Sequence, residues 1–250
     1  MRVAVFGSSR PTTPELYKSA AFELGLWLAQ KGHVCVNGGG GQGVMGAANR
    51  GVRSGNGTIV GVIHEMFQVD NDEDKQIPNM IVARGPDLNE RKQMLMDNSD
   101  YFVVMPGGTG TFDELWDMVS HRSLGMKGLA NKPIVLVNLD GFFDGSIEQL
   151  RRAYRDQILY NPIETYFTIA TTLAEVQRCV EEHAAKLKAA AASGGSAAGG
   201  QSRDADSRLT TRPSSGTSGA GAVDSRLAAV AVGAFLAGAL LTATVLQRKR

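Results

Sequence analysis

The sequence predicts an α/β fold with a mostly parallel, doubly wound sheet and helices on both faces, followed by a single C-terminal transmembrane helix. Over residues 1–188, short apolar runs alternate with longer amphipathic patterns, which is the order that right-handed strand–helix–strand crossovers produce. Glycine-rich turns follow two of these runs, and ligands of parallel sheets bind at the carboxyl ends of strands. We therefore expect segments far apart in the chain to form one binding crevice.

The first strand is expected over residues 2–7, which are mostly apolar. Thr13 and Pro14 predict the start of a helix, because threonine is a common cap and proline suits the first helical position. Apolar residues at helical spacing continue this helix to residue 31, and a glycine follows. The second strand is then expected over residues 33–37.

A glycine-rich turn, residues 38–46, follows the second strand and contains Gly39, Gly40 and Met45. Such a turn lets backbone N–H groups approach an anion, although a lone glycine pattern is a weak sign of a dinucleotide site. This pattern follows the second strand instead of the first, and no acidic residue ends a strand about 20 residues later, so a nicotinamide site is disfavoured. Tight packing of helix on sheet is the alternative interpretation.

The third strand is expected over residues 58–63 and a short fourth strand over residues 80–82. The polar residues between them, 64–78, include the acidic side chains of Asp70, Asp72, Glu73 and Asp74. No periodic apolar pattern accompanies this run of charge, so we interpret it as a solvated loop.

A helix is expected from Asp87 to about residue 97, and its first turn carries Arg91 and Lys92. Cations are unfavourable near a helix N-terminus, which suggests that these two residues serve something other than helix stability. Arginine can hold a phosphate or a carboxylate with two parallel hydrogen bonds. The alternative is a solvated helix face on which the two cations pair with Glu90.

The fifth strand, residues 101–105, leads into the most informative stretch, residues 106–114. Three glycines leave backbone N–H groups accessible there, and a helix N-terminus follows, so a phosphate is a suitable ligand. The cations of the preceding helix would balance the charge of that phosphate. Alternatively, Thr111 and Glu114 form a capping box, in which Glu114 only satisfies a backbone N–H. The residues of this loop that we expect to bind the ligand are Gly107, Gly108, Thr109, Gly110, Thr111, Asp113 and Glu114.

The remaining elements are expected to be helices over residues 115–124, 147–159 and 172–188 and strands over residues 133–137 and 166–170. Residues 1–188 carry a net charge of −3, so no basic surface for nucleic acid is expected. Cys35 and Cys179 are expected to be small buried hydrophobic residues. The four histidines have no metal-ligand spacing, and we expect no metal or redox cofactor.

Taken together, these motifs resemble those of the Lonely Guy family of cytokinin riboside 5′-monophosphate phosphoribohydrolases, whose members are often labelled lysine decarboxylases. The resemblance lies in Leu-Asn-Glu-Arg-Lys at 88–92, in Pro-Gly-Gly-Thr-Gly-Thr followed by Asp-Glu within 106–114, and in the glycine turn at 38–46. Ser8 and Ser9 match the first loop of the family. The resemblance covers about residues 1–180, and the order and spacing of the motifs make it specific.

The resemblance implies a Rossmann-like fold, a homodimer with sites near the interface, and no cofactor. It implies hydrolysis of the N-glycosidic bond of an N6-modified adenosine 5′-monophosphate to free base and ribose 5-phosphate. By position, Arg91 and Glu114 match the catalytic pair, while Lys92, the loop from Gly108 to Glu114, and Ser120 match substrate-binding positions. The chain departs from the family at several positions near the base-binding side, so the resemblance implies the reaction but not which base is preferred.

The implied chemistry agrees with the residues present. Breaking a ribosyl–base bond builds positive charge on the sugar, and a carboxylate beside the anomeric carbon stabilises that charge and orients or deprotonates water. Glu114 is the candidate carboxylate, and Arg91 would offset the phosphate charge and fix the ribose. The competing class is a nucleotide- or cofactor-carrying module without hydrolysis, which has no need of an acid facing the ribose.

The C-terminal part of the chain differs in composition. Residues 189–226 are rich in Ala, Gly and Ser and predict a flexible linker. Residues 227–246 carry no charge and precede a basic tail, 247–250; twenty helical residues span about 30 Å, the thickness of a bilayer core. We expect a single-pass tail anchor with the catalytic domain in the cytosol, and we favour the mitochondrial outer membrane or a peroxisome-type membrane.

Overall fold

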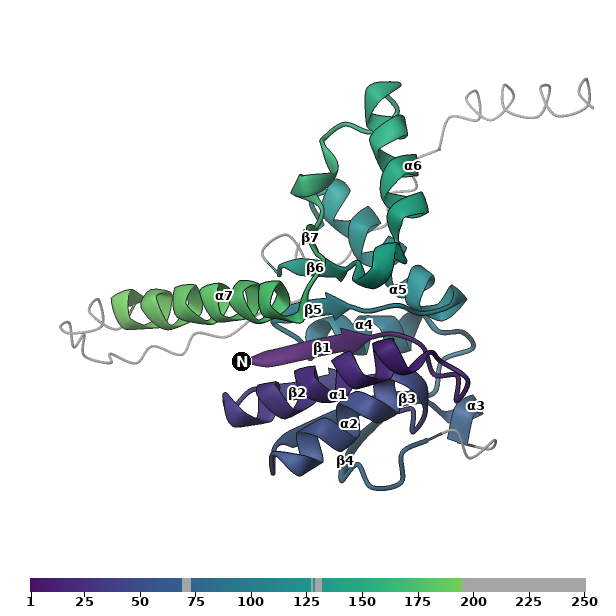
Figure 1. Ribbon diagram of the computed structural model, residues 1–250, viewed down its shortest axis with the longest axis vertical. Helices are drawn as coiled ribbons and strands as arrows, with labels where there is room; N and C mark the ends of the chain where they lie inside the picture. Colours follow the sequence, from purple (N-terminus) through teal and green to yellow (C-terminus); the bar gives the residue numbers. More distant parts are fainter. Residues whose placement is uncertain (69–72, 127, 129–131, 195–250) are drawn as a thin grey trace, which may run out of the picture. The chain divides into compact units, whose positions relative to one another are not determined.

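The computed structural model describes residues 1–68, 73–126, 128 and 132–194. The described residues form a seven-stranded sheet in which every pair of neighbouring strands is parallel (Figure 1). No helix in this part of the chain is long and apolar enough to cross a membrane. The expected transmembrane span, the basic tail and the linker beyond residue 194 lie outside the described residues.

The order of the strands across the sheet is β4-β3-β2-β1-β5-β6-β7, so the direction of winding reverses between β1 and β5. In register, Val3 lies opposite Cys35 on one side and Tyr101 on the other. Ligands of open parallel sheets bind where the winding reverses, which places the expected crevice beyond the carboxyl ends of these central strands. The strands are β1 (Arg2–Phe6), β2 (Val34–Asn37), β3 (Thr58–His64), β4 (Asn79–Ala83), β5 (Tyr101–Val104), β6 (Ile134–Val137) and β7 (Thr168–Ala170).

Helices cover both faces of the sheet, as the doubly wound prediction requires. One face is covered by α1, α2 and α7, and the other by α4, α5 and α6 (Figure 1). The helices are α1 (Glu15–Gln30), α2 (Gly43–Ser54), α3 (Glu65–Gln68), α4 (Asn89–Asp97), α5 (Thr109–Ser123), α6 (Asp144–Arg155) and α7 (Leu173–Gly194), with short 3-10 turns at η1 (Leu139–Gly141) and η2 (Ile163–Thr165).

The core is divided into two layers by the alternation of side chains along each strand. Val3 and Val5 point into the layer under α1 and α2, whereas Ala4 and Phe6 point into the layer under α4 and α5. All four side chains are at most 2% exposed. Because both faces are buried, the strands are continuous apolar runs, which is how the sequence shows them.

Several expected boundaries are wrong in ways that have a physical cause. Helix α5 begins at Thr109 instead of 115, within the glycine motif itself, and α6 covers 144–155 instead of 147–159. Helix α7 continues to Gly194, past the expected linker start at 189, since a run of alanines favours helix. The segment 64–78, expected to be a loop, contains the short helix α3.

The first helix also starts differently from the prediction. Pro14 occupies the cap position of α1, and no side chain caps that helix. The Thr13 hydroxyl instead contacts Ser8 Oγ at 2.7 Å and donates to the Arg10 carbonyl at 2.6 Å. Thr13 therefore shapes the loop between β1 and α1 rather than the end of the helix.

Candidate active site

Three loops that are far apart in the sequence meet at Ser8, directly after β1. The Ser8 N–H donates to the Pro106 carbonyl at 3.0 Å, and the Ser8 carbonyl accepts from the N–H of Val44 at 2.7 Å. These bonds tie the end of β1 to the glycine loop after β5 and to the start of α2. The expected convergence at the strand ends is confirmed, and Ser8 is its centre.

The glycine loop after β5 leaves its backbone open on one side. Gly108 occupies the N-cap position of α5, and no side chain makes a capping hydrogen bond there. The capping-box interpretation of Thr111 and Glu114 is therefore wrong. Gly107 packs closely, because an added Cβ would lie 2.7 Å from Thr111 Cβ and 2.9 Å from Ser8 N. An added Cβ at Gly108 or Gly110 would meet nothing within 4 Å. Backbone N–H groups of the first turn of α5 can therefore receive an anion.

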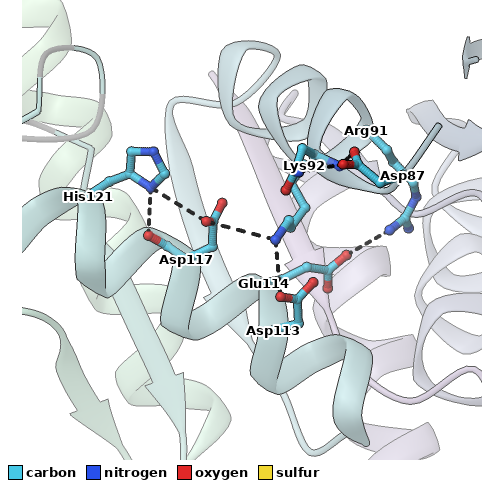
Figure 2. A network of polar contacts seen from close by, with 8 residues as sticks. Asp87, Arg91, Lys92, Asp113, Glu114, Asp117 and His121 are labelled. Atoms are coloured by element: carbon cyan, nitrogen blue, oxygen red, sulfur yellow. Dashed lines mark hydrogen bonds and ion pairs between the residues drawn. The ribbon is translucent and has the colours of Figure 1, made fainter. Parts of the chain in front are cut away.

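Arg91 and Glu114 form a shielded ion pair between α4 and α5 (Figure 2). Arg91 Nη1 donates to Glu114 Oε1 at 3.2 Å, and the two side chains are only 11% and 12% exposed. Arg91 Nε also donates to the carbonyl of Val62 at the end of β3, at 3.0 Å. The guanidinium lies 6.0 Å from the centre of the Phe67 ring on α3. Contacts from α5, β3 and α3 therefore hold it in one orientation.

Burial and the neighbouring arginine act in opposite directions on the pKa of the Glu114 carboxyl. Burial raises this pKa above its ordinary value of 4.5, and the neighbouring Arg91 opposes the shift. An acid in this environment costs free energy to ionise, because the low polarity of its surroundings disfavours charge. The pair thus presents a carboxylate whose proton affinity is tuned by one arginine, a property typical of catalytic acids.

Lys92 belongs to a second, more exposed set of charges beside this pair. Figure 2 shows Lys92 reaching from α4 to Asp113 and Asp117 on α5, with Nζ–Oδ1 distances of 3.0 and 3.8 Å. Glu90 turns away and accepts bonds from the backbone N–H groups of residues 84 and 85, both at 2.8 Å. The alternative in which Arg91 and Lys92 pair with Glu90 is therefore wrong.

The second glycine turn, residues 38–41, borders the ion pair. A Cβ on Gly38 would collide with Nη2 of Arg91, so a larger residue at this position would force the guanidinium to move. Gly39 has a φ of +76°, a conformation that favours glycine. Met45 packs against Gly40, whose added Cβ would lie 2.8 Å from Met45 Cε and 3.9 Å from Ser9 Cβ. This turn therefore lies against the arginine of the ion pair.

A buried polar network fixes the second glycine turn, and the sequence did not reveal it. Asn37 Oδ1 accepts from Gly39 N at 2.9 Å, and Asn37 Nδ2 donates to Asn49 Oδ1 at 2.6 Å. Asn49 Nδ2 in turn donates to Asp74 Oδ2 at 3.0 Å, and Asp74 also pairs with Arg53 at 2.8 Å. Asp74 is 8% exposed, so the expected solvated loop is wrong at this residue.

Ser120 stands apart from the other expected binding residues. It is exposed on a later turn of α5, where its carbonyl accepts from Ser123 Oγ at 2.9 Å and from Leu124 N at 3.1 Å. Over the described residues, no hydrogen bond or ion pair joins it to Arg91 or Glu114. The same part of the chain contains no group of three or more His, Cys, Asp or Glu side chains that could hold a metal ion.

Comparison with solved structures supports the architecture. The chain matches a molybdenum cofactor binding protein from Rippkaea orientalis with a TM-score of 0.54 at 20% identity, over 72% of this chain and 95% of that one. It matches the molybdenum cofactor carrier protein of Chlamydomonas reinhardtii with a TM-score of 0.52 at 23% identity, over 72% and 96% of the two chains. At these identities the likeness concerns the fold alone.

Comparison of sequences identifies the family. Residues 45–180 match the family model described as possible lysine decarboxylase. A probable cytokinin riboside 5′-monophosphate phosphoribohydrolase of Oryza sativa subsp. japonica is 30% identical over 73% of this chain and 72% of its own length. A protein of the same activity name from Mycobacterium tuberculosis is 41% identical over 57% and 73%. The chain belongs to this lysine-decarboxylase-like family, the Lonely Guy family of proteins named cytokinin riboside 5′-monophosphate phosphoribohydrolases.

Proposed function

We propose that this protein hydrolyses the N-glycosidic bond of an N6-modified adenosine 5′-monophosphate and releases the free base and ribose 5-phosphate. The observation that carries the proposal is the shielded Arg91–Glu114 pair beside an open glycine loop. The names of the relatives in rice and in Mycobacterium tuberculosis support the same reaction. A module that only carries a nucleotide would have no use for a buried carboxylate at this position.

The chemistry follows from the two parts of the site. The backbone around Gly108 and Gly110 receives the 5′-phosphate, which fixes the nucleotide. Cleavage of the bond between the anomeric carbon and the base nitrogen leaves positive charge on the sugar, and the Glu114 carboxylate stabilises that charge. Water adds its oxygen to the anomeric carbon and passes one proton to Glu114. Glu114 then gives up this proton, and the departing base gains one, so the carboxylate is regenerated.

Arg91 has two tasks in this mechanism. It opposes the rise that burial causes in the pKa of the Glu114 carboxyl, and it holds the carboxylate in place through the 3.2 Å contact. Its Nη2 lies beside Gly38 of the second glycine turn, next to where we place the ribose. Loss of Arg91 should therefore weaken both substrate binding and turnover.

The test is to incubate the full chain with adenosine 5′-monophosphate and with its N6-isopentenyl form and to measure free base and ribose 5-phosphate by chromatography. We expect the two products in equal amounts, with the Arg91→Ala variant much slower. The matched control is Arg155→Ala, which removes an arginine paired with a carboxylate on α6 and should leave the rate unchanged. Saturable binding of both nucleotides without release of base would favour the carrier module instead.

We also propose that the protein is a homodimer anchored in a membrane by residues 227–246. The uncharged 20-residue stretch supports the anchor, and the resemblance to the family supports the dimer. In cells, the protein should resist carbonate extraction, and a tag at Met1 should be accessible to protease on intact organelles. Recovery in the soluble fraction would contradict the anchor, and a monomeric mass by light scattering in detergent would contradict the dimer.

A further inference from the structure

The charges around the glycine loop do not by themselves suit a dianionic phosphate. Three carboxylates, those of Asp113, Glu114 and Asp117, face two cations, and both cations are engaged. Arg91 pairs with Glu114, and Lys92 pairs with Asp113 and Asp117. A phosphate near this loop would meet a local excess of negative charge, so a further cation is needed.

A cavity of about 250 Å³ borders the start of the glycine loop at Pro106 and Gly107. Ser8 and Gly107 line it at the strand ends, and Arg10, Thr12 and Tyr17 line it from the β1–α1 loop and α1. It lies at the point where the winding of the sheet reverses between β1 and β5. Such a position is where ligands of open parallel sheets bind.

Arg10 is the cation of this cavity, and its backbone is held firmly. Its N–H donates to Ser8 Oγ at 3.1 Å, and its carbonyl accepts from Thr13 N at 3.1 Å and from the Thr13 hydroxyl at 2.6 Å. The residue itself is exposed. Within the described residues, none of the ion pairs includes Arg10. The loop therefore places an arginine that no carboxylate neutralises beside Gly107.

We propose that Arg10 binds the 5′-phosphate of the substrate from the cavity side of the glycine loop and thereby makes the site select a nucleotide over a nucleoside. The inference rests on the proposed function, because it assumes the same substrate. A guanidinium offers two parallel N–H donors to a phosphate. Arg91 and Lys92 then remain with the carboxylates, and Arg10 supplies the charge that the phosphate requires.

The experiment compares the full-length wild type with the Arg10→Ala, Arg10→Lys and Arg151→Ala variants. Arg151 is an exposed arginine on α6, so its removal controls for the loss of one positive charge. Steady-state release of base is measured with N6-isopentenyl adenosine monophosphate. Titration calorimetry measures binding of ribose 5-phosphate and of adenosine, and thermal melts check that each variant is folded.

We expect Arg10→Ala to raise the KM for the nucleotide and the Kd for ribose 5-phosphate by about 10- to 100-fold, the range for a lost charge-assisted hydrogen bond. The Kd for adenosine should stay unchanged. The Arg10→Lys variant should have KM and Kd values between those of the wild type and those of Arg10→Ala. Unchanged ribose 5-phosphate binding, or an equal loss for ribose 5-phosphate and adenosine, would overturn the proposal. If the wild type releases no base, the proposed function fails, and the ribose 5-phosphate titrations still decide the role of Arg10.

Discussion

Gly110→Ala is predicted to change stability and activity in opposite directions. Gly110 lies in the first turn of α5, and an added Cβ would meet nothing within 4 Å. The methyl group therefore causes no clash, and replacing glycine by alanine in a helix gains about 0.5–1 kcal/mol. For a domain of this size, that gain corresponds to a rise in Tm of about 1–4 °C.

The same methyl group occupies the space through which a phosphate would approach the backbone. We expect the KM for the nucleotide to rise by about 10- to 100-fold, because at least one charge-assisted hydrogen bond to the phosphate is lost. The assay is steady-state release of base, combined with a thermal melt of the same sample. The two readouts together separate a blocked ligand site from a damaged fold.

Gly145→Ala is the matched control for this prediction. Gly145 occupies the first turn of α6, is exposed, and also has nothing within 4 Å of an added Cβ. The control should show a similar rise in Tm with unchanged KM. If Gly110→Ala keeps the KM of the wild type while its Tm rises, no anion approaches the loop at this point, and the argument from open backbone is refuted.

Three further predictions concern the surroundings of the ion pair. The Gly38→Ala variant should fold, which a thermal melt would check, but its added methyl group should displace the guanidinium of Arg91. Steady-state kinetics should then show a kcat that is lower by about 10-fold or more. Asp74→Ala should lower the free energy of unfolding by about 1–3 kcal/mol in urea titrations, since it removes a buried acceptor from Asn49 and the carboxylate that pairs with the partly exposed Arg53. Glu114 has a raised folded-state pKa. The free energy that Glu114 contributes to stability is therefore complete below pH 4.5 and is lost as the pH rises through the folded-state pKa. Because the ionised carboxylate is the active form, kcat should rise over the same pH range. A kcat that stays flat across this range would contradict the assignment.

The sheet and its strand ends could be predicted from the sequence because they depend on local patterns. Apolar runs buried on both faces identified the strands, and glycines identified the turns. The helix boundaries were less accurate, because α5 begins within the glycine motif at Thr109. Glycine and threonine are poor helix formers, so helix propensity does not predict that α5 starts within this motif.

Within the site, the resemblance to the family names Arg91 and Glu114 as a catalytic pair, but the sequence does not reveal that the two side chains contact each other. The pair of Arg91 with Glu114 joins two helices that only the folded sheet brings together. The role of Asp74 was misread, because an acidic run next to a loop resembles solvent-exposed charge until Asn49 is found beside it. Pairings over long sequence distances leave no periodic signal, so these contacts required the structure.

We propose that Glu114 is catalytic, and the turnover rate of Glu114→Gln tests this role directly. Glutamine has nearly the same shape and can still accept the hydrogen bond from Arg91, and no helix cap depends on this residue. It cannot supply negative charge to the sugar, so we predict that kcat falls by at least about 100-fold, while Tm and nucleotide binding remain close to those of the wild type. A folded Glu114→Gln variant that releases base at nearly the wild-type rate would contradict the account.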